Sequence, residues 1–280
     1  MLSILYGVLS AINWGAGDFA GGIVSRRAGV YKAAFYGYSG GLIFLAALLA
    51  LFREPFPAWT DLGWSGLAGV MGSAGLLLLL RSLAEGKMSI AAPVSALMAA
   101  VLPVIASSLT EGLPGPIKYA GFALALLAIW LISRGDGHQK KFHLHLADLR
   151  LPLLSGALFG FYFIFMNKGS QTATIWPMVA ARCCGSFLLF WFALAKRELS
   201  WPGKTIASLV LLNAAGDIGG NTFFILAGQA GRLDVAAVLG SLYPGMTVLL
   251  AGLLLHERLN RLQWIGIAAA FTAIVLMTVP

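Results

Sequence analysis

Apolar runs of about 20 residues, separated by short polar or Pro- and Gly-containing breaks, fill almost the whole chain. A bilayer core about 30 Å thick needs roughly 20 apolar residues per helix, so each run has the length of a membrane span. The pattern therefore predicts an all-α integral membrane protein with ten transmembrane helices. Their expected ranges are about 2–22, 33–52, 62–83, 90–109, 117–133, 151–168, 175–196, 206–228, 234–255 and 262–279.

One connection differs from the others because it is long and hydrophilic. It reads RGDGHQKKFHLHLADLR and covers 134–150, close to the midpoint of the chain. The sequence therefore predicts three parts: a five-helix unit at 1–133, a central hydrophilic loop at 134–150 and a second five-helix unit at 151–280.

Short stretches of the two units match in the same order, which indicates an internal repeat. The segment 5–15, LYGVLSAINWG, resembles 154–164, LSGALFGFYFI, and the segment 86–97, GKMSIAAPVSAL, resembles 231–242, GRLDVAAVLGSL. Because five spans is an odd number, the second unit must enter the membrane from the opposite side to the first. Such an inverted repeat is typical of transporters with a site near the middle of the bilayer.

Composition excludes several other classes of protein. Charged residues make up 11% of the 280 residues, against about 25% in soluble domains, so a soluble enzyme would lack polar surface. The net charge of +8 comes with no dense basic tract, so we expect no nucleic-acid partner. The three histidines of the central loop, His138, His143 and His145, lack a nearby set of cysteines or carboxylates, so no metal is expected. No catalytic constellation falls at a common membrane depth, and no cofactor or enzymatic activity is predicted.

The basic residues are distributed unevenly over the connections, and this predicts an orientation. The odd-numbered connections carry 14 Lys and Arg residues and the even-numbered ones carry 4, at Arg53, Lys118, Lys168 and Arg232. Cytoplasmic loops are enriched in Lys and Arg. We therefore predict a multi-pass protein of the plasma (inner) membrane with a cytoplasmic central loop and both termini outside.

Charged and amide side chains inside the predicted spans mark candidate site residues, because a charge there costs at least about 2.5 kcal/mol. Asp217 lies near the middle of the eighth span, and Asn213 and Asn221 lie on the same helix face at i−4 and i+4. Arg182 in the seventh span is the natural counter-charge for Asp217 and would attract a substrate carboxylate. A purely structural ion pair is the alternative.

Aromatic residues beside polar ones form a second set of candidates. The first span carries Asn13 and Trp14, and the sixth carries Tyr162 and Phe163 at the corresponding depth. These residues either line a cavity or pack the core, and the further candidates for the same wall are Trp176 and Tyr243.

Proline and glycine predict local backbone features of the spans. Pro244, in the segment GSLYP, is expected to kink the ninth span, either as a gating segment or as a static bend. Three GxxxG pairs are expected to allow close packing of helices. They are Gly17 with Gly21, Gly37 with Gly41, and Gly216 with Gly220.

Several of these segments resemble the EamA-like ten-helix members of the drug/metabolite transporter superfamily. The resemblance rests on NWG in the first span, on PVSAL in the fourth, and on the Glu-then-Gly segments EGLPGPIKYAG and HERLNRLQWIG that close the two units. It implies two five-helix halves around a central cavity, and export of amino acids or other small metabolites. Some relatives move nucleotide sugars or cationic drugs, and relatives are commonly drawn with both ends in the cytoplasm, against the charge distribution here.

The sequence therefore predicts a secondary transporter that exports small metabolites by alternating access, with a small-molecule substrate, the lipid bilayer and a candidate coupling proton as partners. The alternative is a proton-coupled antiporter of cationic drugs or other lipophilic compounds. Small multidrug antiporters depend on a Glu in the first helix, where this chain has Asn13 and Trp14. Asp217 is the acid that would serve the alternative function.

Overall fold

The structure, a computed structural model, describes residues 1–85, 88–132, 146–201, 203–255 and 259–278. All regular secondary structure in these ranges is helical. The first half contains α1 (Leu2–Ala28), α2 (Val30–Phe52), α3 (Trp59–Glu85), α4 (Met88–Thr110) and α5 (Pro116–Ile132).

The second half begins within the predicted central loop, whose residues 134–145 lie outside the described ranges. Helix α6 begins at Leu146, earlier than the expected 151, and runs through Pro152. The elements are α6 (Leu146–Gly169), α7 (Ile175–Ala195), the short 3₁₀ helix η1 (Lys204–Ile206), α8 (Ala207–Gln229), α9 (Leu233–Gly240), α10 (Tyr243–Leu254) and α11 (Arg261–Thr278).

Much of the described chain is apolar enough to cross a bilayer. Six helical stretches have the required length and hydropathy, and three shorter helices are also apolar. Large side chains such as Phe187 (65% exposed) and Trp191 (53%) point outward from α7, where lipid rather than water would solvate them. The all-α membrane fold is thus confirmed, while the number of ten spans stays a prediction.

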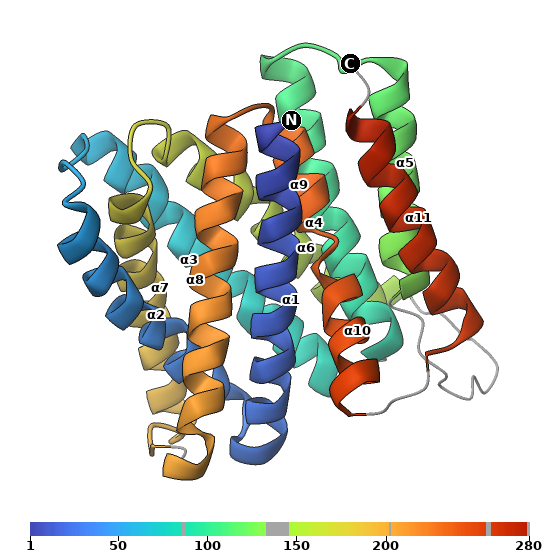
Figure 1. The fold of residues 1–280 in the computed structure, drawn as a ribbon. Helices are drawn as coiled ribbons and strands as arrows, with labels where there is room; N and C mark the ends of the chain where they lie inside the picture. Colours follow the sequence, from blue (N-terminus) through green and yellow to red (C-terminus); the bar gives the residue numbers. More distant parts are fainter. Residues whose placement is uncertain (86–87, 133–145, 202, 256–258, 279–280) are drawn as a thin grey trace.

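The ninth predicted span, 234–255, is two helices rather than one. Pro244 has no N–H to donate to the carbonyl of Gly240, so the i→i−4 ladder cannot continue. The chain instead makes tight turns, in which the Leu242 N–H donates to Leu239 O (3.1 Å) and the Gly245 N–H to Leu242 O (2.9 Å). The predicted bend is a complete break between α9 and α10 (Figure 1), and the two helices together, Leu233–Leu254, keep the length and hydropathy of one span.

Helices of the two halves pack against each other in a reciprocal pattern. Helix α1 packs most extensively against α8, and α3 against α6; likewise α2 contacts α8 and α3 contacts α7, while α5 pairs with α11. In chain order, α1, α2, α3 and α5 correspond to α6, α7, α8 and α11. With this exchange the α1–α8 pair becomes the α6–α3 pair, the α2–α8 pair becomes the α7–α3 pair, and the α5–α11 pair is unchanged. The pattern is what two related halves would produce, and the opposite membrane orientation of the halves stays a prediction.

The predicted GxxxG packing is confirmed. Gly17 and Gly216 bring α1 and α8 into backbone contact: a Cβ on Gly216 would lie 2.6 Å from the Gly17 Cα. Gly41 of α2 similarly leaves room for Ile218 of α8. Helix α8 therefore packs closely against both α1 and α2, and Figure 1 shows it running beside α1.

Candidate functional site

Arg182 is placed on the inner face of α7 and is almost completely buried, with 4% of its surface exposed. The buried residues of α7 include Met178, Ala181, Arg182 and Gly185, whose spacing places them on one helix face. Gly185 makes room for an aromatic ring beside the arginine, because a Cβ there would lie 2.6 Å from the Tyr38 hydroxyl. The sequence thus directs a cation into the centre of the helix bundle.

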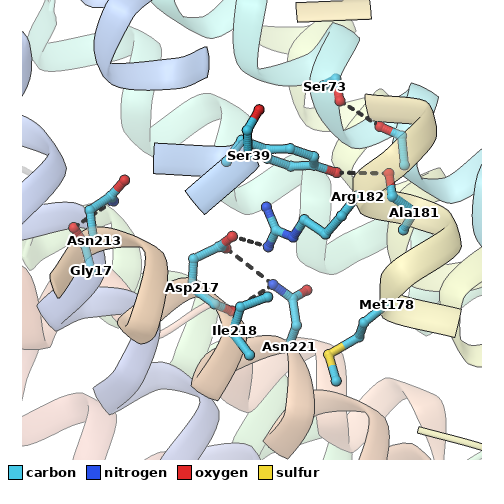
Figure 2. A network of polar contacts seen from close by, with 12 residues as sticks. Gly17, Ser39, Ser73, Met178, Ala181, Arg182, Asn213, Asp217, Ile218 and Asn221 are labelled. Carbon is cyan, nitrogen blue, oxygen red and sulfur yellow. Dashed lines mark hydrogen bonds and ion pairs between the residues drawn. The ribbon is translucent and has the colours of Figure 1, made fainter. Parts of the chain in front are cut away.

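Asp217 of α8 is the counter-ion of Arg182, as predicted. The Arg182 Nη2 donates to Asp217 Oδ2, and Figure 2 shows the two side chains reaching toward each other from α7 and α8. The side chains differ in exposure, with 5% for Arg182 and 31% for Asp217. Asp217 is therefore the accessible member of the pair and Arg182 the enclosed one.

Asn221 extends the pair into a chain of polar groups across three helices. Its Nδ2 donates to Asp217 O (2.7 Å) and to Asp217 Oδ1 (3.1 Å), and its Oδ1 accepts a hydrogen bond from the Tyr162 hydroxyl of α6. The carboxylate of Asp217 therefore receives hydrogen bonds from both Arg182 and Asn221. Arg182, Asp217, Asn221 and Tyr162 are called the central polar cluster below.

Asn213 does not join the central polar cluster, although it lies one turn from Asp217. Its Nδ2 donates to Gly17 O of α1 (2.8 Å), as Figure 2 also shows. Asn213 therefore ties α8 to α1. The predicted line of three polar groups on α8 is divided, with two members in the central polar cluster and one at a helix contact.

Trp14 and Phe163 come together beside the cluster. The Trp14 ring lies 5.6 Å from the Phe163 ring and 5.8 Å from the ring of Phe224. Tyr162 and Phe163 are also neighbours, with ring centroids 5.7 Å apart. These rings pack in one hydrophobic cluster, in which Phe163 and Phe224 are buried, and Tyr162 connects the cluster to Asn221. Phe224 is a neighbour that sequence reasoning did not single out.

The structure does not bring three other predicted residues into the cluster. Trp176 lies in the first turn of α7, where its Nε1 donates to Glu54 O (3.1 Å). Tyr243 begins α10 and packs in the hydrophobic core around α4, α5 and α9. Asn13 donates from Nδ2 to Leu9 O (2.9 Å), within its own helix. The places of Trp176 and Tyr243 follow from a helix start and the α9–α10 break, which residue type alone did not reveal.

Tyr38 of α2 is a site residue that the sequence did not single out. Its ring lies 3.8 Å from the Arg182 guanidinium carbon, a cation–π contact. Nothing in the pattern distinguished Tyr38 from the other aromatic residues of α2, since its role depends on α2 packing against α7.

Arg182 still has unused hydrogen-bonding capacity. Within the described residues its Nη1 is buried and has no hydrogen-bond partner. A guanidinium offers five N–H donors, and a buried donor left unsatisfied costs about 1–3 kcal/mol. The arrangement can therefore accept a further acceptor group, such as a carboxylate oxygen.

The described residues form no group of three or more His, Cys, Asp or Glu side chains that would hold a metal ion. The histidines of the central loop lie outside the described ranges.

Comparison with known proteins places this helical membrane protein in a class. The model of the EamA-like transporter family matches residues 1–134 and 149–279. The chain therefore belongs to the EamA-like transporter family, of the drug/metabolite transporter superfamily, and the predicted resemblance is confirmed. The members of this family are membrane transporters rather than enzymes.

A solved crystal structure, described only as that of a protein, superimposes with a TM-score of 0.77 and covers 99% of this chain and 96% of its own. The two chains share 17% identity, so the likeness shows the fold alone. No curated protein matches the sequence significantly.

Proposed function

We propose that this protein is a secondary transporter that exports amino acids or similar small metabolites across the plasma membrane by alternating access. The observation that carries the proposal is the buried Nη1 of Arg182, which has no hydrogen-bond partner among the described residues of this transporter-family fold. An intramembrane cation with a free donor favours a substrate that bears a carboxylate or another acceptor.

The surroundings of Arg182 favour a compact substrate with an anionic or zwitterionic end and an apolar body. Charge-assisted hydrogen bonds gain strength where water is excluded, so the Arg182 guanidinium would hold the carboxylate. The wall of Trp14, Tyr162 and Phe163 would accept an apolar side chain. Rocking of one half against the other would expose the site to each side in turn.

A proton-coupled antiporter of cations is the second candidate, and the exposure of Asp217 favours it. A carboxylate that is 31% exposed within a membrane span is able to exchange a proton for a cation, and the same aromatic rings could hold that cation. The two candidates differ in which member of the ion pair contacts the substrate.

A binding screen on the purified protein separates the candidates. Amino acids, nucleobases and quaternary cations are tested for a rise in melting temperature, since a ligand that binds the folded state stabilises it. We expect amino acids to raise it, and we expect Arg182→Ala to remove the effect while the variant remains folded. Stabilisation only by quaternary cations, retained in Arg182→Ala and lost in Asp217→Asn, would assign the protein to the cation antiporters.

Transport in proteoliposomes tests the ion pair itself. Asp217→Asn removes the counter-charge of Arg182, and we expect it to reduce transport more than it reduces expression or melting temperature. If Asp217→Asn and Arg182→Gln each transport amino acids at the wild-type rate, the pair has no part in the mechanism.

A further inference from the structure

Helix α7 begins without a cap from its own sequence. The Thr174 side chain at the N-cap position makes no capping hydrogen bond, and the first turn contains no acidic residue. Pro177 has no N–H, but Ile175 and Trp176 have N–H groups without partners in the helix. The start of the helix that carries Arg182 therefore depends on groups from elsewhere in the chain.

Glu54 provides this cap from the connection between α2 and α3. Its carboxylate accepts hydrogen bonds from the backbone N–H groups of Thr174 (2.7 Å), Ile175 (2.8 Å) and Trp176 (3.0 Å). A carboxylate at this position also interacts favourably with the positive end of the helix dipole.

Two neighbours of Glu54 hold it in this position. Arg53 ends α2 in a left-handed conformation, with φ 47° and ψ 44°, and so turns the chain away from the axis of α2. Phe56 packs edge-on against the Trp176 ring, with centroids 5.0 Å apart. The contact between the first and second halves is thus specific in both hydrogen bonding and packing.

The cap is mechanically connected to the candidate site. Arg182 follows Ile175 by seven residues, so it lies about 10 Å further along the same helix. An uninterrupted α-helix is stiff along its axis, and α7 is continuous from Ile175 to Ala195. The position of the first turn therefore sets the depth at which the guanidinium meets Asp217.

We propose that Glu54 is a positioning residue that caps α7 from the opposite half of the chain and thereby fixes Arg182 against Asp217 in the transport site. The proposal rests on the proposed function in that Arg182 belongs to this site. Glu54 itself would touch no substrate and would act through α7.

A double-variant cycle of melting temperatures tests the proposal on the purified full-length protein. Glu54→Gln and Asp217→Asn are measured singly and together. If Glu54 positions Arg182, the ion pair is weaker in Glu54→Gln, and the drop caused by Asp217→Asn is smaller in that background than in the wild type. Asp61→Asn is the matched control, because Asp61 accepts one hydrogen bond from Thr172 (3.0 Å) across the same halves and does not cap α7.

Hydrogen exchange reports the cap directly. The amides of Ile175 and Trp176 should exchange at least about tenfold faster in Glu54→Gln, as expected when a hydrogen bond to a charged group is lost, and should remain unchanged in Asp61→Asn. Glu54→Asp keeps the charge and is a second, milder variant. In it, the exchange rates of the two amides should lie between those of the wild type and Glu54→Gln.

Additive drops in melting temperature for Glu54→Gln and Asp217→Asn would overturn the inference and leave Glu54 as a structural cap only. Proteoliposome transport of L-phenylalanine adds a functional measurement, with a raised apparent KM in Glu54→Gln and an unchanged one in Asp61→Asn. If the wild-type protein does not transport L-phenylalanine, the amino-acid proposal fails separately, because the stability cycle contains no ligand.

Discussion

At the scale of the residue, Arg182 is held by two different kinds of contact. Asp217 neutralises its charge and the Tyr38 ring covers the face of the guanidinium, while the Nη1 donor has no hydrogen-bond partner among the described residues. A charge enclosed in a span is tolerated only where such contacts replace water. The incomplete set of partners supports the proposed role of this pair in transport, and a purely structural pair stays the alternative.

The ring of Tyr38, rather than its hydroxyl, should matter for this arrangement. The ring lies 3.8 Å from the guanidinium carbon, whereas the hydroxyl donates to Ala181 O over 3.4 Å, near the limit for a hydrogen bond. Tyr38→Phe should therefore melt close to the wild type. Tyr38→Leu should lose about 2 kcal/mol of stability, typical of a desolvated cation–π contact. Equal melting temperatures for the Phe and Leu variants would show that the cation–π contact contributes nothing.

At the scale of the element, the contact between α1 and α8 determines where the central polar cluster lies. Glycines on both helices bring their backbones together, and Asn213 adds a hydrogen bond to Gly17 O. Helix α8 carries Asp217 and Asn221, so a shift of α8 away from α1 would displace both residues relative to α7.

Substitution of Gly216 tests this helix contact. Gly216→Ala places a Cβ 2.6 Å from the Gly17 backbone, and the helices must separate, which costs about 1–3 kcal/mol. The matched control is Gly22→Ala on α1, because a Cβ there meets nothing within 4 Å. We expect the control to melt at or above the wild-type temperature, since Ala favours helix by about 1 kcal/mol over Gly. Similar melting temperatures for the two variants would contradict the packing argument.

At the scale of the whole molecule, the two ends of the helix bundle differ in their basic residues. The α1–α2 and α7–α8 connections lie at the same end, whereas the α2–α3, α6–α7 and α8–α9 connections lie at the other (Figure 1). The first group contains Arg26, Arg27, Lys196, Arg197 and Lys204. Helix α1 begins and α11 ends at the end opposite to these residues.

Cysteine labelling tests the orientation that this arrangement predicts. Ser200→Cys lies at the basic end and Gln171→Cys at the other, each in a background with Cys183 and Cys184 replaced by Ser. An impermeant maleimide added to intact cells should label Gln171→Cys and should leave Ser200→Cys unlabelled until the membrane is opened. Reporter fusions should place both termini outside and the loop around Lys140 inside. Labelling of Ser200→Cys in intact cells would reverse the assignment.

The sequence by itself determined the features that depend on hydrophobic length and on the cost of burying charge. Apolar runs predicted the helices, with most boundaries within a few residues of those observed. Asp217 and Arg182 were recognisable because charge inside a span requires a partner, and the GxxxG pairs because only glycine permits backbone contact between helices.

Only the tertiary structure decided which neighbours these residues meet. It separated Asn213 from Asp217, brought Tyr38 and Phe224 close to the cluster, and placed Glu54 beside Trp176. These contacts join residues from helices distant in sequence, and their geometry depends on crossing angles, helix starts and the α9–α10 break. Hydrophobic periodicity fixes which face of a helix turns inward, but it carries no information about which side chain of another helix will be there.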